Sequence, residues 1–383
     1  MIYEPREDSF LLAEEVKKYA KGRCLDIGTG SAIQAEAAAK KADSVLAVDI
    51  QKKVIEHCRK NVKNKKITFR QSDLFSNIKG KFDTIIFNPP YLPEDARLKD
   101  LTLDGGKKGY EVLERFINSL NNYLNEDGIC LIVFSSLTNK EKVNEFLENN
   151  LFEYEQTAYQ KLFFEELYAY LIKKSAILKK LNRKSIKNIK KLAKGHRGIA
   201  FSASYKGKKV VVKIKNPESE AIDKIKYESA LLKELNKKGI GPKILFSDDD
   251  FILMKYVEGN LILDYFKKNN KKEIIKILKK IFEQLFVLDK MHLNKEEMHH
   301  PVKHIMINKE KVVMIDFERA KRSLDAKNVT QFCQFLILGK ISEMLMQKGI
   351  KISKEQMIEA AKQYKHNPNK KSFSQILTFI SSS

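Results

Sequence analysis

The sequence predicts an α/β protein of two domains: a doubly wound, mostly parallel sheet, followed by a small two-lobed α+β domain. Three observations support this. The 383 residues exceed the usual size of one hydrophobic core. In the first half, short apolar runs alternate with helical patterns, as in βαβ units. In the second half strands come first, and helical patterns dominate after Leu261. We expect domains at 1–174 and 192–383, joined by a basic, helical or flexible connector at 175–191.

Each expected element of the first domain is a short apolar run or an amphipathic stretch. A closing antiparallel pair is expected after five parallel strands. The expected strands are Cys24–Ile27, Ser44–Val48, Ile67–Arg70, Thr84–Phe87 and Ile129–Phe134, then Phe152–Ala158 and Glu166–Ile172, with helices at Ala32–Lys40 and Lys53–Lys63. In the second domain we expect strands at Lys208–Lys215 and Phe251–Tyr256 around a helix at Glu220–Leu235.

Composition excludes several classes of protein. A content of 43% hydrophobic and 32% charged residues is typical of a soluble globular chain. The longest apolar run, Ile129–Phe134, is far too short to span a membrane, and the first residues do not have the pattern of a signal peptide. The four cysteines are scattered without a Cys-x-x-Cys pair. This argues against a disulfide framework or a structural metal site and favours a cytoplasmic location.

Positive charge is concentrated in the second half. Residues 1–173 carry 26 Lys and Arg against 27 Asp and Glu, a net of −1, and the rest of the chain carries 46 against 22, a net of +24. A lysine-rich genome would tilt both halves, so the asymmetry favours an anionic partner for the second half: RNA, the ribosome or nucleotide phosphates. A merely solvated basic surface is the alternative.

A glycine-containing turn follows the first strand. Gly28 and Gly30 would let the backbone approach a ligand closely. The third glycine of the dinucleotide fingerprint is absent, which argues against NAD. Asp49, at the end of the second strand, can accept hydrogen bonds from ribose hydroxyls, and Asp73, after the third, from an adenine amino group. These residues and Asp26 fall at the carboxyl ends of strands, where cofactors bind in such sheets.

The fourth strand runs into Asn88-Pro89-Pro90-Tyr91. The two prolines fix the backbone, so the Asn88 amide and a backbone carbonyl can orient an sp² or amine nitrogen toward a methyl donor. Tyr91 can stack on a planar group. A methyl sulfonium is already an excellent electrophile, so positioning supplies much of the rate.

With these motifs the first 174 residues resemble the class I, Rossmann-like methyltransferases, and among them the HemK/PrmC group that methylates the glutamine of the Gly-Gly-Gln loop of translation release factors. The opening Tyr3–Leu12 and the segment Asp104–Gly109 are similar to the archaeal and eukaryotic branch. The resemblance implies S-adenosylmethionine as cofactor and a small zinc-binding activator subunit as a partner of eukaryotic relatives. It implies cofactor contacts at Ser9, Asp26, Gly28, Asp49, Asp73, Leu74 and Asn88.

One departure is Ala32, where the family usually has glycine; we expect it to tighten the methionine end of the pocket. The same tetrapeptide occurs in adenine-N6 methyltransferases of DNA and RNA, which remain the alternative for this half. The near-neutral first half has no excess of positive charge with which to bind nucleic acid, although the basic second half could supply it.

The second half has the order of parts of a protein kinase. A glycine-containing hairpin precedes a strand with a lysine, a glutamate follows on a helix, and an aspartate ends a late strand. This half resembles predicted archaeal serine/threonine kinases related to small atypical kinases, which implies binding of ATP and Mg²⁺. The matching positions are Gly195, Gly198, Lys213, Glu228 and Asp316, with Met254–Gly259 as the segment that would receive adenine.

The second half departs from this family where the catalytic base belongs. No Asp occupies the base position in Met298–His304, and His304 falls about where a metal-binding Asn is expected. His299, His300 and Lys303 could take base or phosphate-contact roles, with His299 and His304 the candidates for phosphotransfer. The alternative is a pseudokinase that transfers nothing and attaches the methyltransferase to RNA or the ribosome.

Overall fold

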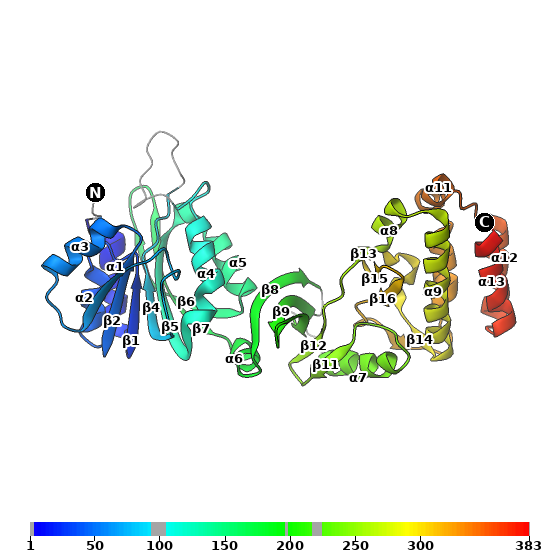
Figure 1. Ribbon diagram of the computed structural model, residues 1–383, viewed down its shortest axis with the longest axis horizontal. Helices are drawn as coiled ribbons and strands as arrows, with labels where there is room; N and C mark the ends of the chain where they lie inside the picture. Colours follow the sequence, from blue (N-terminus) through cyan, green and yellow to red (C-terminus); the bar gives the residue numbers. More distant parts are fainter. Residues whose placement is uncertain (1–3, 93–104, 196–197, 217–223, 383) are drawn as a thin grey trace. The chain divides into compact units, whose positions relative to one another are not determined.

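The computed structural model describes residues 4–92, 105–195, 198–216 and 224–382 (Figure 1). Tyr3, Asp104, His196, Arg197 and the start of the helix expected from Glu220 lie outside the described residues. The chain forms two compact units, Met1–Lys190 and Lys191–Ser383.

The first unit is built on a mixed seven-stranded sheet in the order β3-β2-β1-β4-β5-β7-β6. Strands β1 to β5 pair in parallel, and β7 runs antiparallel to both β5 and β6. The strands are β1 (Arg23–Ile27), β2 (Ser44–Asp49), β3 (Ile67–Gln71), β4 (Phe82–Phe87), β5 (Leu124–Ser135), β6 (Phe152–Lys161) and β7 (Glu166–Lys174). The expected parallel sheet with a closing antiparallel pair is therefore confirmed.

Helices cover both faces of this sheet, so its central strands are buried on both sides, as expected of parallel strands. Helices α1, α2 and α3 contribute to one hydrophobic cluster with the strands. On the other face α4 packs through Phe116 against Phe87, with ring centroids 4.6 Å apart. The helices of this unit are α1 (Glu7–Tyr19), α2 (Ile33–Ala39), α3 (Lys52–Asn61), α4 (Glu111–Tyr123), η1 (Ser136–Thr138), α5 (Lys140–Asn149) and α6 (Ala176–Arg183).

The expected connector at 175–191 is not simply helical or flexible. After α6, strand β8 (Ile186–Lys194) forms the edge of a five-stranded sheet. Ile186 and Ile189 are buried, whereas most of the strand's lysines are exposed. Charged side chains protect an edge strand from pairing with other chains. Part of the lysine excess in the second half therefore belongs to an edge strand, which the run of lysines made hard to predict from the sequence.

The rest of the five-stranded sheet follows in the order β11-β12-β10-β9-β8. Helix α7 packs on β10, β11 and β12. These elements are β9 (Gly198–Tyr205), β10 (Lys208–Lys215), α7 (Lys224–Lys237), β11 (Ile244–Ser247) and β12 (Phe251–Lys255).

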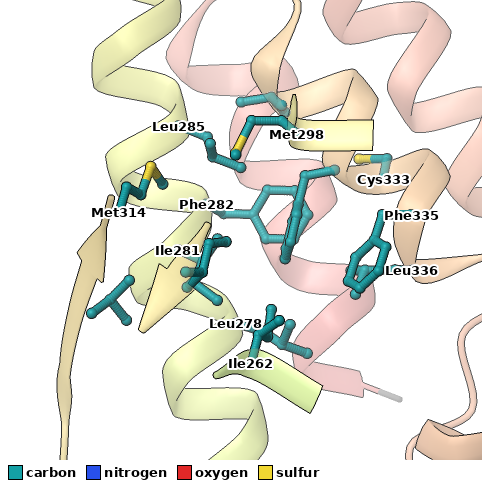
Figure 2. Close-up of a cluster of buried hydrophobic side chains, with 14 of the residues drawn as sticks. Ile262, Leu278, Ile281, Phe282, Leu285, Met298, Met314, Cys333, Phe335 and Leu336 are labelled. Atoms are coloured by element: carbon teal, nitrogen blue, oxygen red, sulfur yellow. The ribbon is translucent and has the colours of Figure 1, made fainter. Parts of the chain in front are cut away.

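The remainder of the second unit is mostly helical around α9 (Lys271–Lys290). Apolar residues of α9 recur every three or four positions, and Figure 2 shows Leu278, Phe282 and Leu285 of this helix in the cluster with Phe335. The other elements are β13 (Asn260–Leu261), α8 (Ile262–Lys268), β14 (Leu293–Asn294), η2 (Glu296–His299), η3 (Pro301–Lys303), β15 (Ile305–Asn308), β16 (Lys311–Met314), β17 (Lys321–Arg322), α10 (Asn328–Leu336), α11 (Gly339–Gln347), α12 (Lys354–His366) and α13 (Lys370–Ser382).

The four cysteines are buried and free. Within the described ranges, no helix is long and apolar enough to cross a membrane, and no group of three or more His, Cys, Asp or Glu side chains is placed to hold a metal ion.

Candidate active site

A cavity opens at the carboxyl ends of β1, β2 and β4 in the first unit. The structure brings nearly all the residues predicted for cofactor and acceptor to its walls, although they come from five separate segments of the chain. The predicted residues that line it are Ser9, Gly28, Gly30, Asp49, Asp73, Leu74, Asn88, Pro89, Pro90 and Tyr91. Asp26 is the exception.

The turn after β1 requires its glycines for their backbone conformation. Gly28 and Gly30 have φ of +65° and +51°, in the left-handed region. Asp49 ties this turn to the end of β2: its carboxylate accepts from the Gly30 N–H at 3.2 Å and the Gln51 N–H at 2.9 Å. Each carboxylate oxygen has a second lone-pair direction, so Asp49 retains acceptor capacity toward the cavity.

Ala32, where the related family usually has glycine, has a strained backbone conformation. It has φ of +68° at the N-terminus of α2, is fully buried and is not among the residues that line the cavity. For a residue with a Cβ this conformation costs about 1–2 kcal/mol. The expected tightening of the pocket is therefore not what Ala32 does in this structure; it strains the turn instead.

The third strand end presents Asp73 and Leu74 together with a residue that the sequence did not indicate. Leu74 has φ of +46°, a conformation that is uncommon for a branched side chain. Arg115 of α4 lines the same wall and pairs with Asp73 at 2.8 Å between Nη2 and Oδ2. Both side chains are partly exposed, so the ion pair positions the carboxylate more than it stabilises the fold.

The Asn88 side chain is fixed by the first helix. Its Nδ2 donates to Asp8 Oδ2 at 2.9 Å and lies 3.4 Å from Ser9 Oγ. Asp8 and Ser9 are almost fully buried, and Gln34 of α2 holds the Ser9 carbonyl at 2.9 Å. Asn88 Oδ1 is buried and, among the described residues, has no hydrogen-bond partner. Asp8 thus fixes the orientation of the Asn88 amide through its Nδ2, and Asn88 Oδ1 remains an acceptor without a partner among the described residues. The sequence analysis included Asp8 in a motif but gave it no role.

Comparisons with known proteins find relatives of part of this chain. Residues 7–164 match the model of the methyltransferase small domain. A Methanocaldococcus jannaschii protein, provisionally named a protein N5-glutamine methyltransferase, is 42% identical over 174 residues, which are 43% of this chain and 88% of that relative. The release factor glutamine methyltransferase of Haemophilus influenzae is 29% identical over 40% of this chain and 62% of its own length. The solved Mtq2–Trm112 complex of E. cuniculi, which methylates eRF1, matches 45% of this chain and 98% of its own at 25% identity and a TM-score of 0.38.

The chain belongs to the S-adenosylmethionine-dependent methyltransferases. The cavity of the methyltransferase domain fits this cofactor in the chemistry of its donors. Gly28, which has no side chain, and the polar residues Asp49 and Asn88 line one space. When bound, the cofactor supplies an electrophilic methyl group. Asp49 and Asp73 would hold its hydroxyl and amino groups, and Asn88 would face the methyl acceptor.

Asp26 lies under the turn of the methyltransferase domain and not in the cavity wall. Its Oδ2 accepts from the Thr29 hydroxyl at 2.6 Å. Burial, which outweighs that hydrogen bond, raises the pKa of Asp26 to about 7, and the neighbouring Asp49 adds to the rise. In this structure Asp26 braces the loop, and the cofactor contact at Asp26 stays a prediction.

The raised pKa predicts how stability depends on pH. A carboxyl whose folded pKa lies above its unfolded value of 3.8 contributes stability below pH 4 and loses it as the pH rises through about 7. Between pH 5 and 8 the wild type should lose about 2–3 kcal/mol relative to Asp26→Asn, at about 1.4 kcal/mol per pH unit. Hydrogen exchange of the β1 and β4 amides at the two pH values measures this. Equal losses in both proteins would mean that Asp26 is ionised throughout.

The second unit contains a buried ionic cluster. Lys213 of β10 lies 2.9 Å from Glu228 Oε2, 2.9 Å from Asp316 Oδ1 and 3.2 Å from Glu318 Oε2. Burial opposes its charge, but the three carboxylates raise the pKa of Lys213 above its ordinary value. Asp316 has φ of +60°, a strained conformation that clusters at functional sites. The residues predicted for nucleotide and metal are thus brought together.

Gly195 and Gly198 lie close to this cluster. The Gly195 N–H donates to the Gly198 carbonyl at 2.8 Å. A Cβ on Gly198 would come within 2.8 Å of Lys213 Cε, so a side chain there would displace the lysine. Glycine is needed at 198 for this close approach.

A second buried lysine, Lys295, was missed by the sequence analysis. Its Nζ contacts Glu297 Oε2 at 3.1 Å and the Asp316 carbonyl, and lies over the Phe317 ring at 4.8 Å. His304 Nδ1 is 4.0 Å from Asp316 Oδ2, and burial followed by the Lys295 charge lowers the pKa of His304.

The two histidines predicted for phosphotransfer are not equivalent. His304 borders the cluster, whereas His299 is exposed, bonds the Glu296 carbonyl at 2.8 Å and lines a separate groove with α10 and α12. The structure therefore places His304, and not His299, beside the cluster, and the phosphotransfer roles of both stay predictions. Lys295 links the Glu297 carboxylate to the backbone carbonyl of Asp316, and a search for His-x-Asp does not indicate this glutamate.

Proposed function

We propose that the methyltransferase domain methylates the side-chain nitrogen N5 of a glutamine in a translation release factor. Asn88 carries the proposal, because its Oδ1 is buried and has no partner among the described residues while Asp8 holds its Nδ2. An acceptor oxygen fixed in this way suits a nitrogen that brings N–H donors, as a glutamine amide does. The names of the two relatives support the same acceptor.

The chain's own residues supply position rather than acid–base chemistry. Asn88 Oδ1 would accept one amide N–H and turn the nitrogen lone pair toward the methyl carbon. The nitrogen–carbon bond then forms as the carbon–sulfur bond breaks, sulfur takes the electron pair, and one amide proton leaves to water. Pro89 and Pro90 keep the backbone beside Asn88 rigid, which retains the geometry that positioning requires.

The test is an acceptor assay. The full chain is incubated with labelled S-adenosylmethionine and separately with release factor, release factor lacking the Gln of its Gly-Gly-Gln loop, ribosomes, tRNA and DNA, each with and without a small zinc-binding activator subunit. We expect label only on intact release factor. Label on adenine of DNA or tRNA, with none on release factor, would contradict this proposal and identify the domain as an adenine-N6 methyltransferase.

We also propose that the second unit is a kinase-like domain that binds Mg-ATP at the Lys213 cluster. The buried carboxylates support it: Glu228, Asp316 and Glu318 surround Lys213, and Glu297 contacts Lys295. Magnesium in such sites is bound through one or two carboxylates and phosphate oxygens. Lys213 would contact the phosphates, and Glu297 or His304 would be the group beside an acceptor hydroxyl.

Thermal-shift titration with ATP, with and without Mg²⁺, tests this, because a ligand that binds only the folded state raises the melting temperature. A magnesium-dependent rise followed by autophosphorylation supports a serine/threonine kinase. A rise without phosphotransfer supports a pseudokinase. No rise at millimolar Mg-ATP removes the nucleotide proposal, and RNA or ribosome binding that weakens steeply with salt would then account for the basic second half.

A further inference from the structure

The two most exposed aromatic side chains of the described residues stand next to each other. Phe163 is 92% exposed and Phe164 88% exposed, and their ring centroids are 4.6 Å apart in an edge-on pair. They form the tip of the β6–β7 hairpin, which the Leu162 N–H closes on the Glu165 carbonyl at 2.8 Å. Apolar residues exposed singly are ordinary, but a paired aromatic tip on a tight turn has no role in the core.

The sheet register locates this tip at the active-site edge. Strand β4 ends at Phe87, which pairs in parallel with Ile132 of β5. Strand β7 is antiparallel to β5 and begins where β5 ends, with Ser135 opposite Leu167. The turn between β6 and β7 therefore projects from the same edge as the carboxyl ends of β1, β2 and β4. It lies two or three strand spacings, roughly 10–15 Å, to the side of β4 and, because Ser135 is three residues beyond Ile132, roughly 10 Å or more farther along the strands.

Further apolar surface adjoins the tip. Leu137 and Tyr159 are each 47% exposed, and the Glu166 N–H joins the hairpin to the Ser136 hydroxyl at 3.1 Å. We call Leu137, Tyr159, Phe163 and Phe164 the hairpin patch. Aromatic side chains of this kind are enriched at protein–protein interfaces and dominate their binding energy.

We propose that the hairpin patch is the docking surface for the protein that presents the methyl-accepting glutamine. A protein interface covers about 800 Å² on each partner, a region about 30 Å across. A protein whose side chain enters the cavity at Asn88 must therefore also cover the hairpin. Lys161, Glu165 and Glu166 flank the two phenylalanines, so the tip has no excess of positive charge to attract a nucleic acid backbone. This inference rests on the proposed methylation of a protein.

The test compares a whole protein substrate with a short peptide. In the full chain we change Phe163→Ser and Phe164→Ser together, and use Leu324→Ser, which is 91% exposed in the second unit, as the matched control. We expect the double variant to raise KM for release factor by 10- to 100-fold with kcat at saturation unchanged. Turnover of a peptide that carries only the Gly-Gly-Gln loop, and cofactor affinity, should not change. The control should behave as wild type in every assay.

Three results would overturn the inference while leaving the proposed methylation intact. One is an unchanged KM for release factor, another is an equal loss on protein and peptide, and the third is loss of stimulation by the activator subunit with KM otherwise unaffected. An unchanged KM with lost binding to phosphatidylcholine vesicles would reassign the patch to lipid. If wild type labels nucleic acid and no protein, the proposed function fails and this inference with it.

Discussion

Replacing Asn88 with alanine is expected to lower kcat for methyl transfer by about a thousandfold or more, with cofactor affinity within a few-fold of wild type. The change removes Oδ1, the buried acceptor without a partner, and Asp8 loses the amide it holds. Groups that act by orientation or by a single preorganised hydrogen bond contribute about 10²–10⁴-fold. Single-turnover kinetics and calorimetric titration with S-adenosylmethionine measure the two quantities separately.

A variant of Asp8 is expected to show a smaller loss of kcat than the variant of Asn88. Asp8→Ala should leave Asn88 in place but free to rotate, so kcat should fall less than in Asn88→Ala, by about one to two orders of magnitude. An alanine at Asn61, an exposed residue of α3, is the control for loss of an amide elsewhere. If Asn88→Ala mainly raised the dissociation constant of the cofactor, Asn88 would be a cofactor ligand and not the group that orients the acceptor.

The parallel sheet could be predicted because the sequence patterns that indicate it lie within short segments of the chain. Strands β4 and β5 contain apolar runs buried on both faces, Ile85–Phe87 and Ile129–Phe134, and the glycine turn and the acids follow strand ends in fixed order. Asp8 could not be predicted in the same way. Its hydrogen bond to Asn88 spans 80 positions, and nothing in its neighbourhood distinguishes a carboxylate that positions an amide from one that favours a helix N-terminus.

Errors arose where local chemistry had two interpretations. A lysine-rich stretch reads as a solvated connector, but in β8 the lysines protect a sheet edge of which only two residues in nine, Ile186 and Ile189, are buried. In the second unit, the segment in which a kinase has its catalytic aspartate contains histidines and no aspartate. Lys295 joins Glu297 to the backbone of Asp316, and Glu297 is recognisable only once Lys295 is known to be buried against it.

Lys213→Met is expected to have the largest effect on stability. The methionine fills similar space but removes the cation that Glu228, Asp316 and Glu318 share. Removing one partner from a buried ion cluster costs about 3–5 kcal/mol. Because the chain has no tryptophan, hydrogen exchange of the β9 and β10 amides is the suitable measurement. Lys215→Met, an exposed lysine on the same strand, should change stability by less than about 0.5 kcal/mol.

The pH dependence separates this electrostatic cause from a packing defect. In the wild type Lys213 lowers the pKa of Asp316 despite burial, so this pairing contributes stability above the unfolded pKa near 4 and loses it as the pH falls. In Lys213→Met the carboxyls should have raised pKa values, which favours the folded state at low pH and costs stability as the pH rises. The deficit of the variant should therefore be greatest above pH 7 and shrink toward pH 4. A second change, Glu228→Gln, should restore part of the loss at pH 7. A deficit that is the same at both pH values would mean that the lost contacts of the lysine stem, and not its charge, hold the second unit together.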